Sequence, residues 1–216
     1  MAYGGDGNDW LTGASGNDTL YGGGGADTFT GGMGDDWFAV DSADDTVTEQ
    51  DSEGTDTVFS TVDHTLAAHV EHLTLGQGAS QGTGNALGNY LLGNAAHNTL
   101  TGLAGNDTLD GGSGTDTASY PNTTAGYRFG LSPDGQWTVT DTDLSNGNDG
   151  TDTLLQMERA QFADGMVTLR VLGETRINTT TTGSQAGPAV TALADGGYVV
   201  TWSSDGQNGT YAQRFD

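Results

Sequence analysis

Four aspartates near the N-terminus recur at intervals of nine residues, each inside a glycine-rich segment. They are Asp9, Asp18, Asp27 and Asp36. A carboxylate offers oxygen ligands, and neighbouring glycines leave their backbone carbonyls unshielded by side chains. All the ligands available in such a segment are therefore oxygens. Calcium accepts about six to eight such oxygens, whereas magnesium demands a tighter octahedral geometry. The spacing therefore predicts a series of calcium sites that repeats along the chain.

The composition indicates that cations are needed for folding. The 216 residues include 29 acidic residues, 24 of them Asp, and only five basic residues, which gives a net charge of −24. The hydrophobic fraction of 33% is low for a conventional core. A chain of this kind is ordinarily disordered unless its charge is neutralised. The same charge excludes nucleic acid and anionic membranes as partners.

Several residue types and motifs that enzymes use are absent. There is no Cys, which excludes disulfides and thiolate metal sites, and no Lys, which excludes a phosphate-binding loop of the usual kind. The metalloprotease motif HExxH and the nucleophile motif GxSxG do not occur. Paired aspartates resemble a glycosidase dyad, yet their register suits cation ligands better. We therefore expect that the chain is not an enzyme.

The aspartates belong to two arrays of nonapeptides. Each repeat begins with Gly, has Asp or Asn at position six and usually has a large apolar residue at position eight. The first array comprises 4–12, 13–21, 22–30 and 31–39, with a weaker copy at 40–48. The second comprises 84–92, 93–101, 102–110 and 111–119, and an isolated match follows at 147–155.

Nine residues suit a six-residue glycine turn followed by a three-residue strand. Only the middle residue of such a strand, at position eight, points to the interior. Two nonapeptides then form one coil of about 18 residues, and each strand pairs with its equivalent one coil later. This arrangement places Asp9 beneath Asp27 and Asp18 beneath Asp36, so that each pair of carboxylates needs a cation between them.

The repeats match the pattern GGxGxDxUx, and over both arrays the chain resembles the repeats-in-toxin (RTX) family of calcium-binding nonapeptides. The resemblance implies an all-β fold, a parallel β-roll (β-solenoid) that binds Ca²⁺ and folds outside the cell. It also implies a ligand scheme. A turn offers its Asp and the carbonyls of positions two and four, and the next turn on the same edge offers its Asp and the carbonyls of positions one and three.

Applied to this sequence, the scheme implies the following metal ligands. The first site comprises Gly5, Gly7, Asp9, Gly22, Gly24 and Asp27, and the second comprises Ala14, Gly16, Asp18, Gly31, Met33 and Asp36. A third, whose upper turn lacks glycines, comprises Gly23, Gly25, Asp27, Val40, Ser42 and Asp45. The second array contributes Gly102, Ala104, Asp107, Gly111, Ser113 and Asp116. Asn89 and Asn98 predict weaker or empty sites, because an amide adds no charge to the ion's shell.

The sequence indicates five segments. Residues 1–48 and 84–119 are the two roll blocks, and 49–83 is a spacer in which we expect the roll to continue with longer coils and fewer ions. Residues 120–170 contain strands at 127–131 and 137–141 around a turn at 133–135, and resemble a short antiparallel β cap. Residues 171–216 read as a C-terminal β meander, a partial repeat unit of a larger protein.

Two functions are compatible with these features. The first is a calcium-dependent folding module of a larger secreted or cell-surface protein, such as an adhesin, toxin or exoenzyme. The resemblance implies export by type I secretion machinery, which fits the absence of an N-terminal signal or transmembrane stretch. The alternative is a calcium-dependent module that binds polysaccharide or another surface ligand. Trp10 and Trp37 are candidates for stacking on sugars, although we expect them on opposite sheets.

Overall fold

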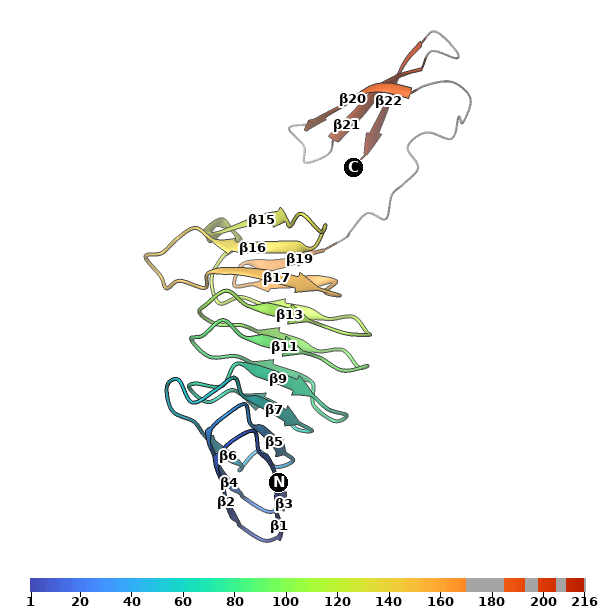
Figure 1. The fold of residues 1–216 in the computed structure, drawn as a ribbon. Coiled ribbons are helices and arrows are strands. Elements are labelled where there is room, and N and C mark those ends of the chain that lie inside the picture. The colour runs from blue at the N-terminus through green and yellow to red at the C-terminus, as the bar shows by residue number, and fades with distance from the viewer. Residues whose placement is uncertain (170–184, 193–197, 205–208, 216) are drawn as a thin grey trace. The chain divides into compact units, whose positions relative to one another are not determined.

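The computed structural model describes residues 1–169, 185–192, 198–204 and 209–215. The chain divides into two compact units, Met1–Arg170 and Val171–Asp216 (Figure 1). The only helical element among the described residues is one 3-10 turn, η1 (Thr124–Gly126). No helix within those residues is long and apolar enough to cross a membrane. The predicted all-β class is therefore confirmed.

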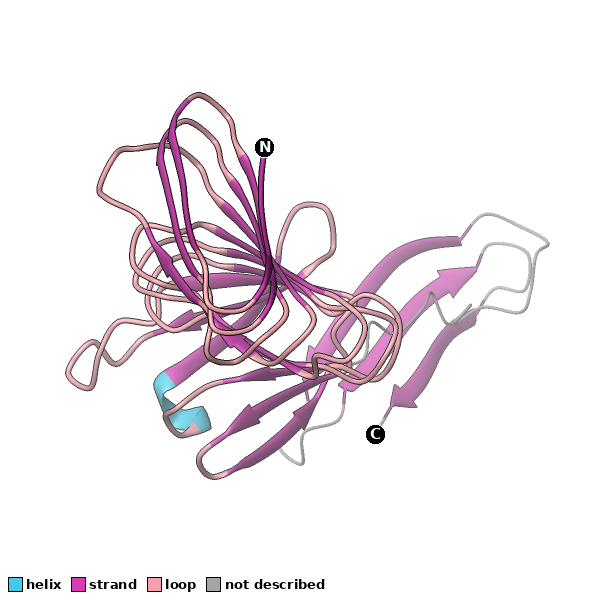
Figure 2. Cartoon of the chain, turned by 90° about the horizontal axis from the view of Figure 1, so that it is seen from below, coloured by secondary structure: helices cyan, strands magenta, loops and turns pink. Residues whose placement is uncertain are grey.

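The first unit is a parallel β-roll whose coils stack on one another (Figure 1). One sheet begins with seven parallel strands: β1 (Ala2–Asp6), β3 (Thr19–Gly24), β5 (Trp37–Val40), β7 (Thr57–Ser60), β9 (His72–Leu75), β11 (Tyr90–Leu92) and β13 (Thr108–Asp110). The other face has two sheets. One contains β2 (Trp10–Ser15), β4 (Thr28–Met33) and β6 (Thr46–Thr48), and the other begins with β8 (His64–Thr65), β10 (Gln81–Thr83), β12 (Thr99–Thr101) and β14 (Thr117–Ser119). Figure 2 shows these coils from the N-terminal end.

Strand pairing follows the nonapeptide phase. Leu11 pairs with Phe29 in parallel register, as the stacking of repeats n and n+2 predicts. The predicted three-residue strands occur in the second array, for example in β11 and β12. In the first array β1 to β4 are five or six residues long. The reason is that the glycine turns also pair with one another there, as Gly5 does with Gly23.

Position-eight side chains form a thin core between the two faces of the roll. All eight are buried: Leu11, Leu20, Phe29, Phe38, Leu91, Leu100, Leu109 and Ala118. Their strand neighbours are partly or fully exposed, and Trp10 beside Leu11 is 88% exposed. Each buried Leu or Phe stabilises the fold by roughly 1.5–3 kcal/mol. Because only one residue in nine contributes, the core is narrow and the turns must be stabilised separately.

The roll continues through the spacer, but the coils change length. Hydrogen-bonded ladder residues lie 18 positions apart in the first array, 20 apart from Asp36 to Asp56, and 15 apart from Asp56 to Glu71. The prediction of longer coils is therefore right for one coil and wrong for the next. β6 and β8 belong to different sheets, so the second face of the roll is interrupted within the spacer.

A hairpin interrupts the roll after β14. It consists of β15 (Tyr127–Leu131) and β16 (Trp137–Asp141), at the positions predicted from the sequence. The roll then resumes with one further coil, formed by β17 (Thr151–Leu155) and β18 (Arg159–Phe162), which pair in parallel with β13 and β14. The interpretation of this whole segment as a cap was therefore too broad. Part of it is a coil, because the nonapeptide at 147–155 brings Leu154 into register with Leu109.

Antiparallel strands close the C-terminal edges of the roll. β16 pairs with β17 at the end of the larger sheet, and β19 (Gly165–Thr168) pairs with β18 at the end of the other. Such strands cover the backbone groups that a parallel edge leaves unpaired. In the second unit, β20 (Gln185–Ala192), β21 (Tyr198–Ser204) and β22 (Gly209–Phe215) form an antiparallel sheet in chain order, which is the predicted meander. The residues between these strands, 193–197 and 205–208, lie outside the described part of the chain.

Candidate metal centres

Each strong turn folds its position-six carboxylate over its own position-one glycine. A Cβ added to Gly22 would stand 2.0 Å from Oδ2 of Asp27, and one on Gly31 would stand 2.2 Å from Oδ2 of Asp36. Any side chain at position one would therefore displace the carboxylate. Position two has a different requirement, since Gly23 has a φ of 91°, which is costly for other residues.

The position-six residues form a ladder along each edge of the roll. The backbone N–H of Asp9 donates to Oδ1 of Asp27 at 2.8 Å, and the N–H of Asp27 donates to Oδ1 of Asp45 at 2.9 Å. On the other edge the N–H of Asp18 donates to Oδ1 of Asp36 at 2.7 Å. The predicted vertical pairs are thus confirmed. In each pair the upper carboxylate uses one oxygen to hold the turn below.

The second oxygen of most ladder carboxylates is buried without a hydrogen-bond partner. Among the described residues this is true of Oδ2 of Asp9, Asp27, Asp36, Asp56, Asp107 and Asp116. An unpaired buried acceptor costs roughly 1–3 kcal/mol, and more when it is charged. The same cost recurs at the same atom of successive turns. Such a pattern indicates that these oxygens are cation ligands, because a bound cation would satisfy all of them.

Within the described residues, only one protein cation forms a salt bridge with a ladder carboxylate. The one salt bridge there joins the N-terminal amine of Met1 to Asp18 at 3.3 Å. Burial raises the pKa of Asp36 and Asp116, and it raises the pKa of Asp107 to about 6. These carboxylates are therefore costly to keep ionised. A divalent ion between two stacked carboxylates removes both their repulsion and the cost of their burial.

Backbone carbonyls of two turns converge on the same space as the carboxylates. The carbonyl oxygen of Gly5 lies 2.2 Å from where a Cβ on Gly23 would stand, and that of Gly7 lies 2.0 Å from the equivalent point on Gly25. Both carbonyls thus face the turn above. From that upper turn the carbonyl of Gly22 faces the turn below. These are the directions that the ligand scheme requires of positions two and four below and position one above.

A family model describes this combination of turn, ladder and strand. The model of the RTX calcium-binding nonapeptide repeat matches residues 3–38 and 83–118, in four copies. The two arrays belong to the RTX calcium-binding nonapeptide family. Together with the parallel roll, the match identifies the two arrays as a calcium-binding RTX β-roll. No curated protein matches the chain.

In the first two predicted RTX sites, the carbonyls of positions one, two and four face the neighbouring turn. The position-three carbonyls of Gly24 and Met33 accept hydrogen bonds from backbone N–H groups at 2.6 Å. The third site departs further from the scheme. Asp27 keeps its unpaired Oδ2, but Asp45 above it does not. Oδ2 of Asp45 accepts hydrogen bonds from the backbone N–H groups of Asp41 and Ser42, each at 3.1 Å. The upper turn has no glycine to expose its carbonyls, and its carboxylate is already satisfied. Whether any of the predicted ligands binds calcium stays a prediction.

The asparagine turns of the second array bind the coil below through hydrogen bonds. Nδ2 of Asn89 donates to the carbonyls of Val70 and Glu71 at 3.1 and 3.2 Å. Its Oδ1 accepts from the backbone N–H of Asn85 in the same turn at 2.7 Å. The side chain of Asn89 is therefore satisfied without an ion.

The returning nonapeptide adds a ladder residue that was not among the predicted ligands. Oδ1 of Asp152 accepts from the N–H of Asp107 at 3.0 Å, across 45 residues of sequence. Both residues are about 1% exposed, and burial raises the pKa of Asp152 to about 8. Asp152 stands in phase within 147–155, so the repeat pattern was a sufficient signal. The pattern did not reveal that Asp107 is its partner, because the inserted hairpin separates the two turns in the sequence.

Glutamates take the place of aspartate where the coils are irregular. Oε2 of Glu71 accepts from the N–H of Asp56 at 2.8 Å, and Oε2 of Glu158 accepts from the N–H of Asp116 at 2.7 Å. The longer side chain reaches the ladder although its backbone is out of the nonapeptide phase. The repeat pattern predicts neither glutamate, because a pattern that requires Asp at position six contains no signal for them.

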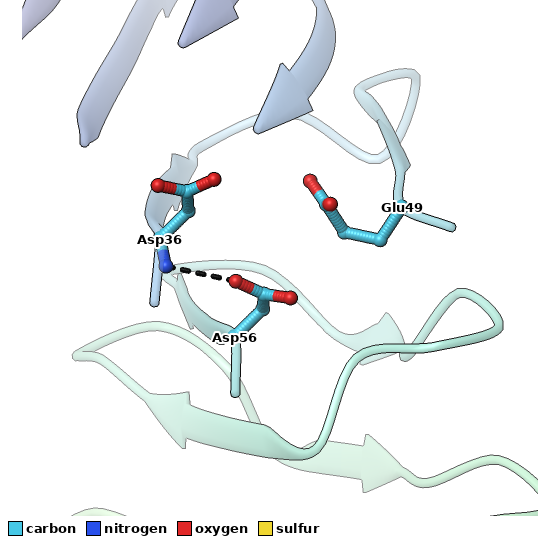
Figure 3. Close-up of side chains that lie close together, drawn as sticks. All are labelled: Asp36, Glu49 and Asp56. Atoms are coloured by element: carbon cyan, nitrogen blue, oxygen red, sulfur yellow. Dashed lines mark hydrogen bonds between the residues drawn. The ribbon is translucent and has the colours of Figure 1, made fainter. Parts of the chain in front are cut away.

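A third glutamate joins two ladder aspartates in a buried cluster (Figure 3). One carboxylate oxygen each from Asp36, Glu49 and Asp56 lies within 4.8 Å of the other two. All three residues are buried, at 2%, 6% and 1% exposure. Burial raises the pKa of Glu49 to about 7 and that of Asp56 to about 6. Asp56 stood in repeat-like spacing with Gly54 and Val58, but nothing in the sequence marked Glu49.

Proposed function

We propose that this chain is a calcium-triggered folding module of a larger secreted protein, such as an adhesin, toxin or exoenzyme, that leaves the cell through type I secretion machinery. RTX repeats are typical of secreted proteins. The observation that carries the proposal is the recurrence of buried, unpaired carboxylate oxygens on both edges of the roll. Without calcium the ladders repel one another and the chain stays unfolded, which suits export. Extracellular calcium then closes the turns.

The energetic linkage is large enough to decide folding. A site filled at about a hundred times its dissociation constant stabilises the folded state by about 2.7 kcal/mol. The thin core contributes only one apolar residue per nonapeptide. The stabilisation from several such calcium sites therefore outweighs the stabilisation from the core. Folding is therefore expected to follow calcium concentration with a steep, cooperative midpoint.

Far-ultraviolet circular dichroism of the full chain tests the proposal. We expect the spectrum of an unfolded chain in EGTA and a β-sheet spectrum in millimolar calcium. Magnesium at the same concentration is the control, and we expect it to leave the chain unfolded because magnesium demands a tight octahedral shell and gives up its water reluctantly. Equal spectra in EGTA and in calcium would show that folding does not depend on the ion.

The aromatic side chains favour this role over the alternative of polysaccharide binding. Tyr3 stacks on Tyr21 with ring centroids 4.7 Å apart, and Trp37 stacks on Phe59 at 5.8 Å. Rings stacked in this way cover one another's faces, whereas a sugar needs a free face. Trp10 is exposed, but β2 and β5 place it and Trp37 on different sheets, as predicted. A glycan array probed with calcium present tests the alternative, and specific calcium-dependent binding would favour it.

We further propose that the module does not catalyse a reaction. Carboxylate pairs such as Asp9 and Asp27 resemble an acid and base dyad only in their proximity. In the ladder, Oδ1 of Asp27 holds a backbone N–H, which makes it part of the framework. Calcium-dependent hydrolysis of a polysaccharide that Asp27→Asn abolished without unfolding the chain would contradict this.

A further inference from the structure

The turn between β6 and β7 differs from every nonapeptide turn of the roll. It spans residues 49–56 and has eight residues, whereas the turn between β11 and β12 has six. Its first residue, Glu49, lies 18 positions after Gly31 and therefore stands where the repeats have glycine. A long acidic side chain thus occupies a position at which the eight strong turns of the arrays have glycine.

The side chain of Glu49 reaches down into the turn of the fourth repeat. Its Oε1 accepts from the backbone N–H of Gly31 at 2.6 Å. A Cβ on Gly31 would stand 2.2 Å from Oδ2 of Asp36 and 2.4 Å from Oε1 of Glu49. Both oxygens therefore border the same small space. Figure 3 shows the carboxylates of Asp36, Glu49 and Asp56 gathered around it.

Two of the three carboxylates present an oxygen that nothing in the described protein satisfies. Oδ2 of Asp36 and Oδ2 of Asp56 are buried without a hydrogen-bond partner. Oδ1 of Asp56 is already used, because it accepts from the N–H of Asp36 at 2.8 Å. Two unpaired oxygens beside a third carboxylate are a costly arrangement unless a cation lies among them.

The spacing of the oxygens matches a calcium ion. Calcium binds oxygen at about 2.3–2.6 Å, so two ligands on opposite sides of the ion lie up to about 5.2 Å apart. The three carboxylate oxygens lie within 4.8 Å of one another. The carbonyl of Gly34 in the lower turn faces the turn that contains Asp56, since it lies 2.1 Å from where a Cβ on Gly54 would stand. An oxygen shell can therefore be built from both turns.

We propose that Asp36, Glu49 and Asp56 bind a calcium ion at a site that the nonapeptide scheme does not contain, with the Glu49 carboxylate as its additional ligand. The site joins the last strong turn of the first array to the spacer. β6, which precedes Glu49, is not paired with β8, so the second face of the roll has no strand pairing at this point. The ion holds the two parts of the roll together there. This inference rests on the proposed calcium-dependent folding.

A third carboxylate distinguishes this site from the two-carboxylate RTX sites. Affinity for calcium rises with the number of charged ligands and with the rigidity of the site. We therefore expect this ion to bind more tightly than those held by a single pair of aspartates. The eight-residue turn is explained by the same geometry, because the extra residues allow Asp56 to reach the ladder after Glu49 has entered the turn below.

Native mass spectrometry of the full chain in a calcium series tests the proposal. Glu49→Gln keeps an acceptor for the N–H of Gly31 but removes a charge, and Asp51→Asn removes a charge from an exposed residue of the same turn. We expect Glu49→Gln to bind one ion fewer, or to bind its tightest ion about tenfold or more less tightly than the unaltered chain does. Asp51→Asn is expected to match the unaltered chain.

Equal ion counts and affinities for Glu49→Gln and the unaltered chain would overturn the site. If Glu49→Gln fails to fold, anomalous diffraction from crystals of the unaltered chain grown with terbium replaces this test. We expect a terbium peak bonded to Glu49, and the absence of that peak would overturn the proposal. A chain that binds calcium through its arrays alone refutes only this inference. A chain that neither binds calcium nor folds with it refutes the proposed function as well.

Discussion

Oδ1 of Asp27 accepts a 2.8 Å hydrogen bond from the backbone N–H of Asp9, while Oδ2 of the same carboxylate is buried with no partner. One oxygen holds the lower turn, and the other faces the space above Gly22. Scaffold and ligand are thus separate atoms of one side chain. Because an amide keeps an acceptor oxygen but loses the charge, Asn substitutions separate the two roles.

Asp27→Asn should weaken calcium-dependent folding more than Asp116→Asn. The residue below Asp27 is the carboxylate of Asp9, whereas the residue below Asp116 is the amide of Asn98. Removing the charge of Asp27 therefore damages a two-carboxylate site, while Asp116 has no carboxylate below it. We expect the calcium midpoint of folding to rise roughly tenfold for Asp27→Asn and less for Asp116→Asn. Calcium titrations followed by circular dichroism measure both, and equal midpoints would refute the ranking.

Gly22→Ala should lower calcium affinity, whereas Gly24→Ala in the same turn should not. A Cβ on Gly22 would stand 2.0 Å from Oδ2 of Asp27 and would push the carboxylate away from its site. A Cβ on Gly24 meets nothing within 4 Å, and Gly24 does not have a positive φ. Isothermal titration calorimetry with calcium compares the two variants. A normal affinity in Gly22→Ala would show that the carboxylate does not need this space.

Acid should stabilise the calcium-free chain. Burial raises the folded-state pKa of Glu49 to about 7 and that of Asp152 to about 8, above their ordinary values near 4. A carboxyl group whose pKa is raised by folding contributes stability that is complete below its unfolded pKa and is lost as the pH rises through the folded value. We expect the β-structure content of the chain to increase as the pH falls from 8 to 5 in metal-free buffer.

With calcium bound, the pH dependence should have the opposite sign, because protons then compete with the ion for the same oxygens. Circular dichroism of the metal-free chain and urea unfolding of the calcium-bound chain, each at pH 5 and pH 8, check the two signs. Less β structure at pH 5 than at pH 8 in the metal-free chain would contradict the raised pKa values.

Bound calcium should be distributed unequally between the two arrays. The turns at 4–39 all have Asp at position six, whereas the second array begins with Asn89 and Asn98, whose amides bond to backbone carbonyls. In crystals grown with calcium, ions are expected beside Asp9, Asp27 and Asp107. Full-occupancy calcium on both asparagines, with none at Asp9 and Asp27, would reverse this conclusion.

The repeat phase was sufficient to predict the parallel roll, the stacked pairs such as Asp9 with Asp27, and the inward position of residues such as Leu11. All of these follow from a strict period of nine, because a period sets the register of a solenoid without information from distant residues. Prediction was weaker where the period fails. The spacer coils of 20 and 15 residues, and the hairpin before β17, cannot be inferred from a repeat that is absent there.

The sequence by itself determined the fold class, the turns that present oxygen ligands and the affinity for a hard cation, since each depends on residues within one or two repeats. Only the tertiary structure decided which carboxylates meet across irregular coils. It brought Asp152 above Asp107 after a separation of 45 residues, and it placed Glu49 beside Asp36 and Asp56. The physical reason is that these contacts depend on loop lengths and on the reach of a longer side chain, neither of which a nine-residue pattern encodes.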